Sequence, residues 1–178
     1  EGKGKVEWAV AWPESGEGFC HSYCNTIPTP QGGTHESGMR SALLRGLRAY
    51  GELVGNRRVA SVTGDEAFSD ATVLISLFIR DPQFQGQTKD KLATAEASRL
   101  VDQIVKDHFD HWLTADPVSS KILLDQLIFR AEERARLSQA KDLARKTATR
   151  KLRLPGKLAD CTQNSAEGTE IFLVEGDS

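Results

Sequence analysis

Alternating apolar and polar positions mark the strands of this chain. Residues 6–12 place a valine or tryptophan at every second position before Pro13, which predicts a strand packed on one face. Residues 19–25 alternate in the same way after a turn, so we expect the two strands to form an antiparallel pair. Residues 72–80 are apolar at nearly every position and predict a strand that is buried on both faces.

The first helical pattern covers residues 35–54 and follows a loop rich in proline and glycine at 26–33. We expect Thr34 to cap the N-terminus of this helix. The apolar face of the helix is formed by Met39, Leu43, Leu47 and Tyr50. Gly38 and Gly46 each lower helix propensity by about 1 kcal/mol relative to alanine, which indicates that another element packs closely there.

Two further helical stretches meet at Asp116 and Pro117. The first starts from Thr94, and its apolar stripe consists of Leu100, Ile104, Val105, Phe109 and Trp112. Asp116 as N-cap and Pro117 at the first helical position then predict a second helix. The stripe of that second helix consists of Leu123, Leu127, Ala131 and Ala135. Beyond Arg136 the apolar face thins while helix formers continue to Arg150, so we expect one helix of about 50 Å whose far end leaves the core.

Basic residues gather towards the C-terminal end, although the net charge of the 178 residues is only −2. Residues 121–157 contain eleven lysines and arginines against four aspartates and glutamates, and no acidic residue interrupts 145–157. This density indicates contact with a phosphate backbone, or else a helix end whose cations complement the dipole and the solvent. No aromatic residue interleaves the basic run, so base stacking is not indicated.

Composition and cysteine usage exclude several classes of protein. No apolar run reaches the roughly 18 residues of a membrane span, and no signal pattern opens the chain. Phe19, His21 and Tyr23 alternate with Cys20, Ser22 and Cys24 as on a strand. The spacing of the two cysteines is loose for zinc. With an odd total of three cysteines, we expect structural thiols in a reducing cytoplasm. The chain lacks an initiator methionine and ends inside a strand-turn motif, so we expect an internal fragment of a longer protein.

The segment with the clearest candidate chemistry is residues 81–92. Pro82 and Gly86 disfavour helix and strand, which predicts an ordered loop. An amide, a hydroxyl and an ammonium group stand side by side at its tip, on Gln87, Thr88 and Lys89. An ammonium is a compact charge and an amide can donate a hydrogen bond, so this tip suits a phosphate group. A solvated surface loop is the simpler alternative.

Four motifs that follow one another in this order resemble the B subunits of bacterial type IIA topoisomerases. They are residues 25–36, 87–92, 154–161 and 172–178. The resemblance covers nearly the whole chain. Residues 27–30 and 151–155 resemble topoisomerase IV more than gyrase.

This resemblance implies an α+β fold and two domains. Residues 1–152 correspond to a transducer domain, a sheet packed on helices with a fold like domain 2 of ribosomal protein S5. Residues 153–178 correspond to a linker and the first strand of a truncated TOPRIM domain.

The resemblance also implies roles for individual residues. Lys89 would reach the terminal phosphate of ATP, and Gln87 would donate a hydrogen bond beside it. Glu175 would be a magnesium ligand and general acid/base in DNA cleavage and religation. The partner Asp-x-Asp motif is missing from the sequence, and one glutamate cannot complete a magnesium site, so this fragment should not cleave DNA. The residues implied to lie near DNA are Arg40, Arg150, Lys151 and Lys157.

The implied function is a module of an ATP-dependent type II topoisomerase that couples ATP hydrolysis to DNA strand passage, with ATP and Mg²⁺ as cofactors. Its partners would be DNA, the A subunit in an A2B2 heterotetramer, and a second B subunit through an ATPase domain, with no membrane. The implied location is the cytoplasm, at the nucleoid. Three alternatives stay open: a gyrase B subunit that supercoils DNA, a non-enzymatic S5-like nucleic-acid-binding domain, and a domain of a related mismatch-repair or chaperone ATPase.

Overall fold

The computed structural model describes residues 4–13, 18–69, 71–151, 167 and 170, with the backbone alone for 69 and 145–151. In chain order the elements are β1 (Lys5–Ala11), β2 (Cys20–Cys24), β3 (Ile27–Pro28), α1 (Thr34–Leu53), the 3-10 helix η1 (Arg57–Ser61), α2 (Gly64–Ser69), β4 (Thr72–Phe78), β5 (Phe84–Gln85), β6 (Lys91–Leu92), α3 (Ala95–Ala115) and α4 (Pro117–Lys151). The predicted α+β class is confirmed. Two compact units, Glu1–Ala135 and Arg136–Ser178, divide the chain, and α4 runs from the first into the second.

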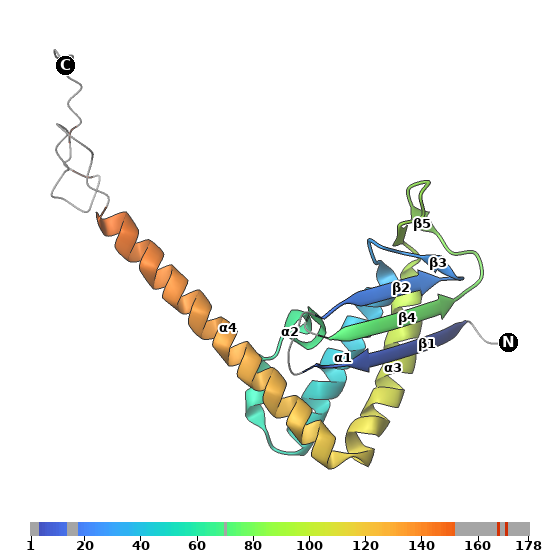
Figure 1. Cartoon of the computed structure of the whole chain (residues 1–178), viewed down its shortest axis with the longest axis horizontal. Coiled ribbons are helices and arrows are strands. Elements are labelled where there is room, and N and C mark those ends of the chain that lie inside the picture. Colours follow the sequence, from blue (N-terminus) through green and yellow to red (C-terminus); the bar gives the residue numbers. More distant parts are fainter. Residues whose placement is uncertain (1–3, 14–17, 70, 152–166, 168–169, 171–178) are drawn as a thin grey trace, which may run out of the picture. The chain divides into compact units, whose positions relative to one another are not determined.

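The main sheet has the strand order β1-β4-β2-β3 (Figure 1). β1 pairs antiparallel with β4, and β2 pairs parallel with β4, so that Trp8 and Ser22 both stand opposite Ile75. The prediction that the first two strands pair with each other is wrong, because β4 lies between them. β4 has the most apolar sequence of the strands, and the central position pairs both of its edges and buries it best.

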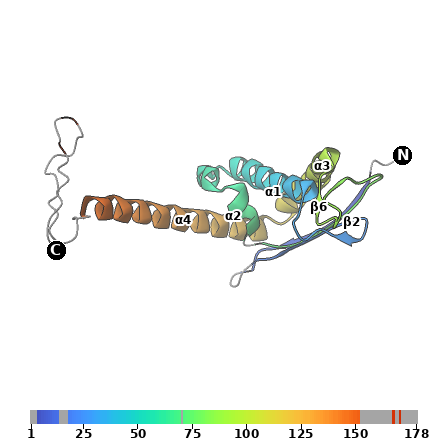
Figure 2. The same cartoon turned by 90° about the horizontal axis from the view of Figure 1, so that it is seen from above.

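Only one face of this sheet is covered by α1 and α3 (Figure 2). On β4 the side chains that face these helices are Val73, Ile75 and Leu77, and none of the three exposes as much as 1% of its surface. Leu74 points to the opposite face and is 47% exposed. The prediction that this strand is buried on both faces is therefore wrong, since a continuous apolar run does not by itself say how many layers cover it.

Close packing of α1 against α3 forms the centre of the core. The predicted apolar face of α1 is confirmed, because Met39, Leu43, Leu47 and Tyr50 are all buried. A Cβ on Gly38 would lie 2.3 Å from the carbonyl oxygen of Ser98, and a Cβ on Gly46 would lie 2.8 Å from Cδ1 of Phe109. Both glycines therefore let α3 approach more closely than any other residue type would allow.

Two expectations about helix faces and ends need correction. Thr34 is the first residue of α1 rather than its cap, because Gly33 occupies the N-cap position with a φ of 146° that only glycine readily adopts. The buried face of α3 consists of Ala97, Val101, Val105, Phe109 and Leu113. It is rotated from the predicted stripe, so Trp112 is 40% exposed and stacks on Phe109 with ring centroids 5.8 Å apart.

The start of α4 follows the prediction. Asp116 accepts a hydrogen bond from the backbone N–H of Ser119 at 3.1 Å, and hydrogen bonding from Ser119 lowers the pKa of the Asp116 carboxyl. The apolar residues that α4 buries are Leu123, Leu124, Leu127, Ile128 and Ala131. Ala135 is exposed, so the predicted stripe ends one turn early. None of the described helices is long and apolar enough to cross a membrane.

Candidate functional site

Residues 81–92 form a short hairpin rather than a loop without strands. Phe84 stands opposite Leu92 and Gln85 opposite Lys91 in the two-residue strands β5 and β6. Sequence signals missed these strands because a ladder of two pairs is too short to show an alternating pattern. The turn between them contains Gly86 at φ 79° and Lys89 at φ 59°.

Hydrogen bonds tie the two ends of the hairpin together. The backbone N–H of Ala93 donates to the carbonyl of Gln83 at 2.8 Å. The N–H of Gln83 donates to the hydroxyl of Thr94, also at 2.8 Å, directly before α3. Because α3 belongs to the core, these contacts give the hairpin a fixed base.

A second set of contacts holds the returning arm of the hairpin against the turn that precedes α1. The N–H of Gln31 donates to the carbonyl of Asp90 at 2.9 Å, and the N–H of Leu92 donates to the carbonyl of Gly32 at 3.0 Å. Gly33 forms a bridge to Leu92, and a Cβ on Gly33 would lie 2.4 Å from the carbonyl oxygen of Leu92. The residue after Lys89 is therefore fixed from outside the hairpin.

The tip of the hairpin is open to solvent. Gln87, Thr88 and Lys89 are all exposed, and within the described part of the chain Lys89 forms no ion pair. A lysine with positive φ is uncommon, so the surrounding turn determines its backbone conformation. The tip thus presents an ammonium group and an amide whose donors are available to an anion. These donors can bind a phosphate oxygen from one side, but they do not enclose a phosphate group.

Arg40 lies on α1 and faces the same cavity as part of the hairpin. This cavity has a volume of about 410 Å³, and its lining includes Arg40, Glu36, Gln85 and Lys91. The guanidinium of Arg40 forms an ion pair with Asp65 of α2 and lies 4.6 Å from the ring centroid of Phe68. It is therefore held in place rather than freely solvated.

The remaining predicted site residues belong to the second unit of the chain, Arg136–Ser178. Arg150 and Lys151 belong to the last turn of α4. Lys157 and Glu175 lie outside the described residues. Within the described ranges no three histidine, cysteine, aspartate or glutamate side chains gather in a way that could hold a metal ion.

Cys20 and Cys24 are free thiols on β2. Burial raises the pKa of Cys24. Burial and the neighbouring Glu36 carboxylate raise the pKa of Cys20 to about 12. Both side chains are therefore protonated, unreactive thiols at neutral pH, as expected for structural cysteines.

Sequence reasoning missed the residues that hold the turn before α1, namely Ser22, Thr29 and His35. All three are buried, and they are joined by hydrogen bonds. The available signal was a threonine between two prolines, followed by two glycines and a histidine, in residues 28–35. That pattern indicates a constrained turn, but not which distant strand the turn contacts.

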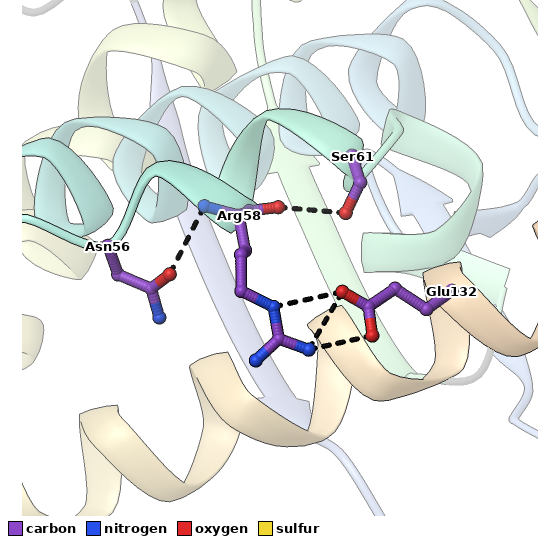
Figure 3. A network of polar contacts seen from close by, with 4 residues as sticks. All are labelled: Asn56, Arg58, Ser61 and Glu132. Atoms are coloured by element: carbon purple, nitrogen blue, oxygen red, sulfur yellow. Dashed lines mark hydrogen bonds and ion pairs between the residues drawn. The ribbon is translucent and has the colours of Figure 1, made fainter.

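A bidentate ion pair connects η1 to α4 (Figure 3). Nε and Nη2 of Arg58 donate to the Glu132 carboxylate at 2.9 and 2.7 Å, and this hydrogen bonding raises the pKa of Arg58. The side chain of Asn56 accepts a hydrogen bond from the N–H of Arg58 at 3.2 Å, and the hydroxyl of Ser61 donates to the carbonyl of Arg58 at 2.8 Å. The backbone around Arg58 is thus held while its side chain reaches α4.

We expect the Arg58→Ala and Glu132→Ala substitutions to couple in a double-mutant cycle of urea unfolding. Each single change removes the same pair, so the double variant should be little less stable than either single variant. Both partners contact solvent, so the coupling should be small and should disappear in 1 M salt, where screening acts within about 3 Å. Full additivity at low salt would show that the pair does not fix η1 to α4. Arg57→Ala on the same 3-10 helix is the matched control.

Solved structures define the class of this fold. The ATP-binding domain of topoisomerase IV from Francisella tularensis superposes with a TM-score of 0.68 at 30% identity, over 76% of this chain and 38% of that one. The 43K ATPase domain of gyrase B from Thermus thermophilus superposes with a TM-score of 0.71 at 28% identity, over 80% of this chain and 39% of that one. The fold is that of a part of the ATPase region of type II topoisomerase B subunits.

The family follows from the sequence of the same region. The family model described as DNA gyrase B matches residues 1–143. The chain belongs to this family.

Curated relatives match over nearly the whole chain. The B subunit of DNA topoisomerase 4 from Bartonella bacilliformis is 58% identical over 99% of this chain and 25% of its own length. The B subunits of DNA topoisomerase 4 from Caulobacter vibrioides and Escherichia coli are 54% and 41% identical, over 98% and 97% of this chain. The chain spans about a quarter of the length of these relatives.

Proposed function

We propose that this chain is an energy-coupling module of an ATP-dependent type II topoisomerase, of the topoisomerase IV kind. Residues 1–152 would form the transducer domain, with the S5-like fold, and 153–178 a linker and the first strand of a TOPRIM domain. The observation that carries this proposal is the exposed tip at Gln87 and Lys89, on a hairpin that is tied at its base and along one arm. The matches to topoisomerase 4 B subunits support it.

In this proposal Lys89 and Gln87 contact the terminal phosphate of ATP bound to a preceding ATPase domain. Bound ATP would supply a terminal phosphoryl group, and negative charge would build on the leaving oxygen as its bond to the phosphorus breaks. The Lys89 ammonium neutralises that charge, and Gln87 donates a hydrogen bond beside it. Because the tip offers only these donors, the chain alone cannot enclose a nucleotide. The isolated chain should therefore hydrolyse little or no ATP.

Release of the cleaved phosphate removes the partner of Lys89, so the hairpin can then adopt a second position relative to the nucleotide. A shift of the hairpin acts on α3 through Gln83 and Thr94, and on α1 through the turn at Gln31 and Gly32. Both helices belong to the core that also buries the first turns of α4. We propose that α4 carries this change towards the DNA-cleaving region.

The remaining assignments concern DNA and magnesium. Glu175 would serve as magnesium ligand and general acid/base, and Arg40, Arg150, Lys151 and Lys157 would lie near DNA. Because Glu175 falls outside the described residues, we derive no step through the metal. The proposed partners are DNA, an A subunit in an A2B2 assembly and a second B subunit that associates through the ATPase domain. The proposed location is the cytoplasm, at the nucleoid.

A reconstituted strand-passage assay tests the function. We expect the longer protein that contains this chain, combined with its A subunit, to unlink catenated DNA circles only when Mg²⁺ and hydrolysable ATP are both present. Negative supercoiling of relaxed circles would indicate the gyrase activity instead. DNA binding without any ATP-dependent change of topology would support the non-enzymatic alternative and contradict the proposal.

A further inference from the structure

A buried polar cluster lies beneath the turn that holds the hairpin. Ser22 of β2, Thr29 after β3 and His35 of α1 are 5%, 1% and 0% exposed. The two hydroxyl oxygens of Ser22 and Thr29 are 2.7 Å apart, and Nε2 of His35 is 3.1 Å from the hydroxyl of Thr29. Polar side chains are rarely so deeply buried unless their hydrogen bonds specify a structure, so this cluster calls for a role.

The hydrogen bonds of this cluster restrict where its protons lie. The hydroxyl of Thr29 is 3.0 Å from the carbonyl of Ser22, and one of the two hydroxyls donates to the other across 2.7 Å. Buried N–H groups without an acceptor are rarer than buried acceptors without a donor, so we place the proton of His35 on Nε2, which donates to the Thr29 oxygen. Nδ1 of His35, which has no partner in the described part of the chain, is then the unprotonated nitrogen. Burial lowers the pKa of His35, which keeps this ring neutral.

Thr29 is the residue through which the cluster reaches the turn. It stands between Pro28 and Pro30, which have no backbone N–H, so its own N–H is the only donor of the three. That N–H donates to the carbonyl of Ser22 at 2.9 Å, and the carbonyl of Thr29 accepts from the N–H of Gly32 at 2.8 Å. Every backbone hydrogen-bonding group of Thr29 is therefore engaged by the core or by the turn.

The turn at residues 31–32 holds the arm of the hairpin that follows Lys89. Gln31 donates to the carbonyl of Asp90, and Gly32 accepts from the N–H of Leu92. A short chain of contacts thus runs from His35 through Thr29 and the turn to the residue that follows Lys89. No side chain of the buried cluster needs to touch a nucleotide for this effect.

We propose that Thr29 and His35 are positioning residues for phosphate sensing, and that they set the place of the Lys89 ammonium through the turn at 31–32. This inference rests on the proposed function of Lys89. Loss of the Thr29 hydroxyl should leave nucleotide binding, which the ATPase domain dominates, nearly unchanged. It should lower the rate of hydrolysis, because misplacing a reacting group by about 1 Å can cost about 100-fold.

The test compares steady-state ATP hydrolysis by full-length subunits assembled with the A subunit and DNA. Thr29→Val keeps the shape of the side chain and removes the hydroxyl, and we expect kcat to fall about 10- to 100-fold with little change in KM. Thr29→Ser returns the hydroxyl and should restore most of kcat. Thr34→Val is the matched control, since the Thr34 hydroxyl has no partner in the described structure and its loss should change neither constant.

A second pair of variants keeps the test decisive if Thr29→Val does not fold. His35→Met removes the donor and should lower kcat, whereas His35→Gln retains an N–H near the position of Nε2 and should preserve it. Wild-type kcat in His35→Met, or in Thr29→Val where that variant folds, would overturn the inference.

The Lys89→Ala background separates positioning from general damage. If Thr29 acts through Lys89, Thr29→Val should add no further loss of kcat in that background. Multiplying losses would mean that Thr29 acts by another route and would overturn the inference. Unchanged hydrolysis in Lys89→Ala alone would instead refute the proposed function, and this inference with it.

Discussion

Replacement of Lys89 by alanine in the assembled enzyme is expected to lower kcat for ATP hydrolysis by about 100- to 1,000-fold. This is the usual cost of removing one donor that stabilises charge developing in a transition state. Binding of a non-hydrolysable ATP analogue should change little, because the ammonium gains most of its interaction as the phosphate bond breaks. Steady-state hydrolysis and equilibrium binding of the analogue together measure the two effects.

Lys91→Ala is the matched control for this change. Lys91 is also exposed and lies two residues away, but it belongs to β6 and faces the cavity shared with Arg40 rather than the tip. Its loss should leave kcat near that of the wild type. If Lys89→Ala hydrolysed ATP at the normal rate, or if a nucleotide-bound dimer showed the hairpin tip far from the nucleotide, the phosphate role would be wrong.

Local sequence signals predicted the elements whose causes are local. The apolar face of α1 and the Asp116 cap followed from spacing and backbone chemistry within one or two turns. The position of β4 between β1 and β2 could not be predicted in this way, because each pairing joins strands that lie more than 50 residues apart in the sequence. The same limit applies to the exposed side of β4, where Leu74 resembles its buried neighbours in sequence but is covered by none of the described elements.

The candidate site divides along the same line. The chemistry of the tip could be predicted, because the amide of Gln87 and the ammonium of Lys89 lie close together in the sequence after Gly86. The support of the tip could not be predicted, because it consists of backbone hydrogen bonds that do not depend on side-chain identity: the N–H of Gln31 donates to Asp90, and the carbonyl of Gly32 accepts from Leu92. The prolines, glycines and histidine of residues 28–35 left a signal in the sequence, but it indicates only a constrained turn and not the strand that the turn contacts.

The Gly33→Ala substitution is expected to disturb the contact between the turn and the hairpin strongly. Gly33 adopts φ 146° and ψ −160°, a conformation that is essentially restricted to glycine. A Cβ at this position would lie 2.4 Å from the carbonyl oxygen and 2.6 Å from the nitrogen of Leu92, and a backbone strand cannot rotate away as a side chain can. Backbone strain and overpacking together should lower the free energy of unfolding by about 2–5 kcal/mol, measured by urea denaturation.

Gly55→Ala is the control for a left-handed alanine without a clash. Gly55 also has a positive φ, of 71°, but no atom lies within 4 Å of a Cβ built there, so only the cost of a left-handed alanine, about 1 kcal/mol, should appear. The excess in Gly33→Ala then reports the clash with Leu92 together with the additional strain of a backbone conformation restricted to glycine. Because Leu92 and Lys89 share one hairpin, that excess should be accompanied by a lower kcat for ATP hydrolysis in the assembled enzyme. Equal destabilisation by the two substitutions, with unchanged hydrolysis, would mean that the hairpin is not seated on this turn.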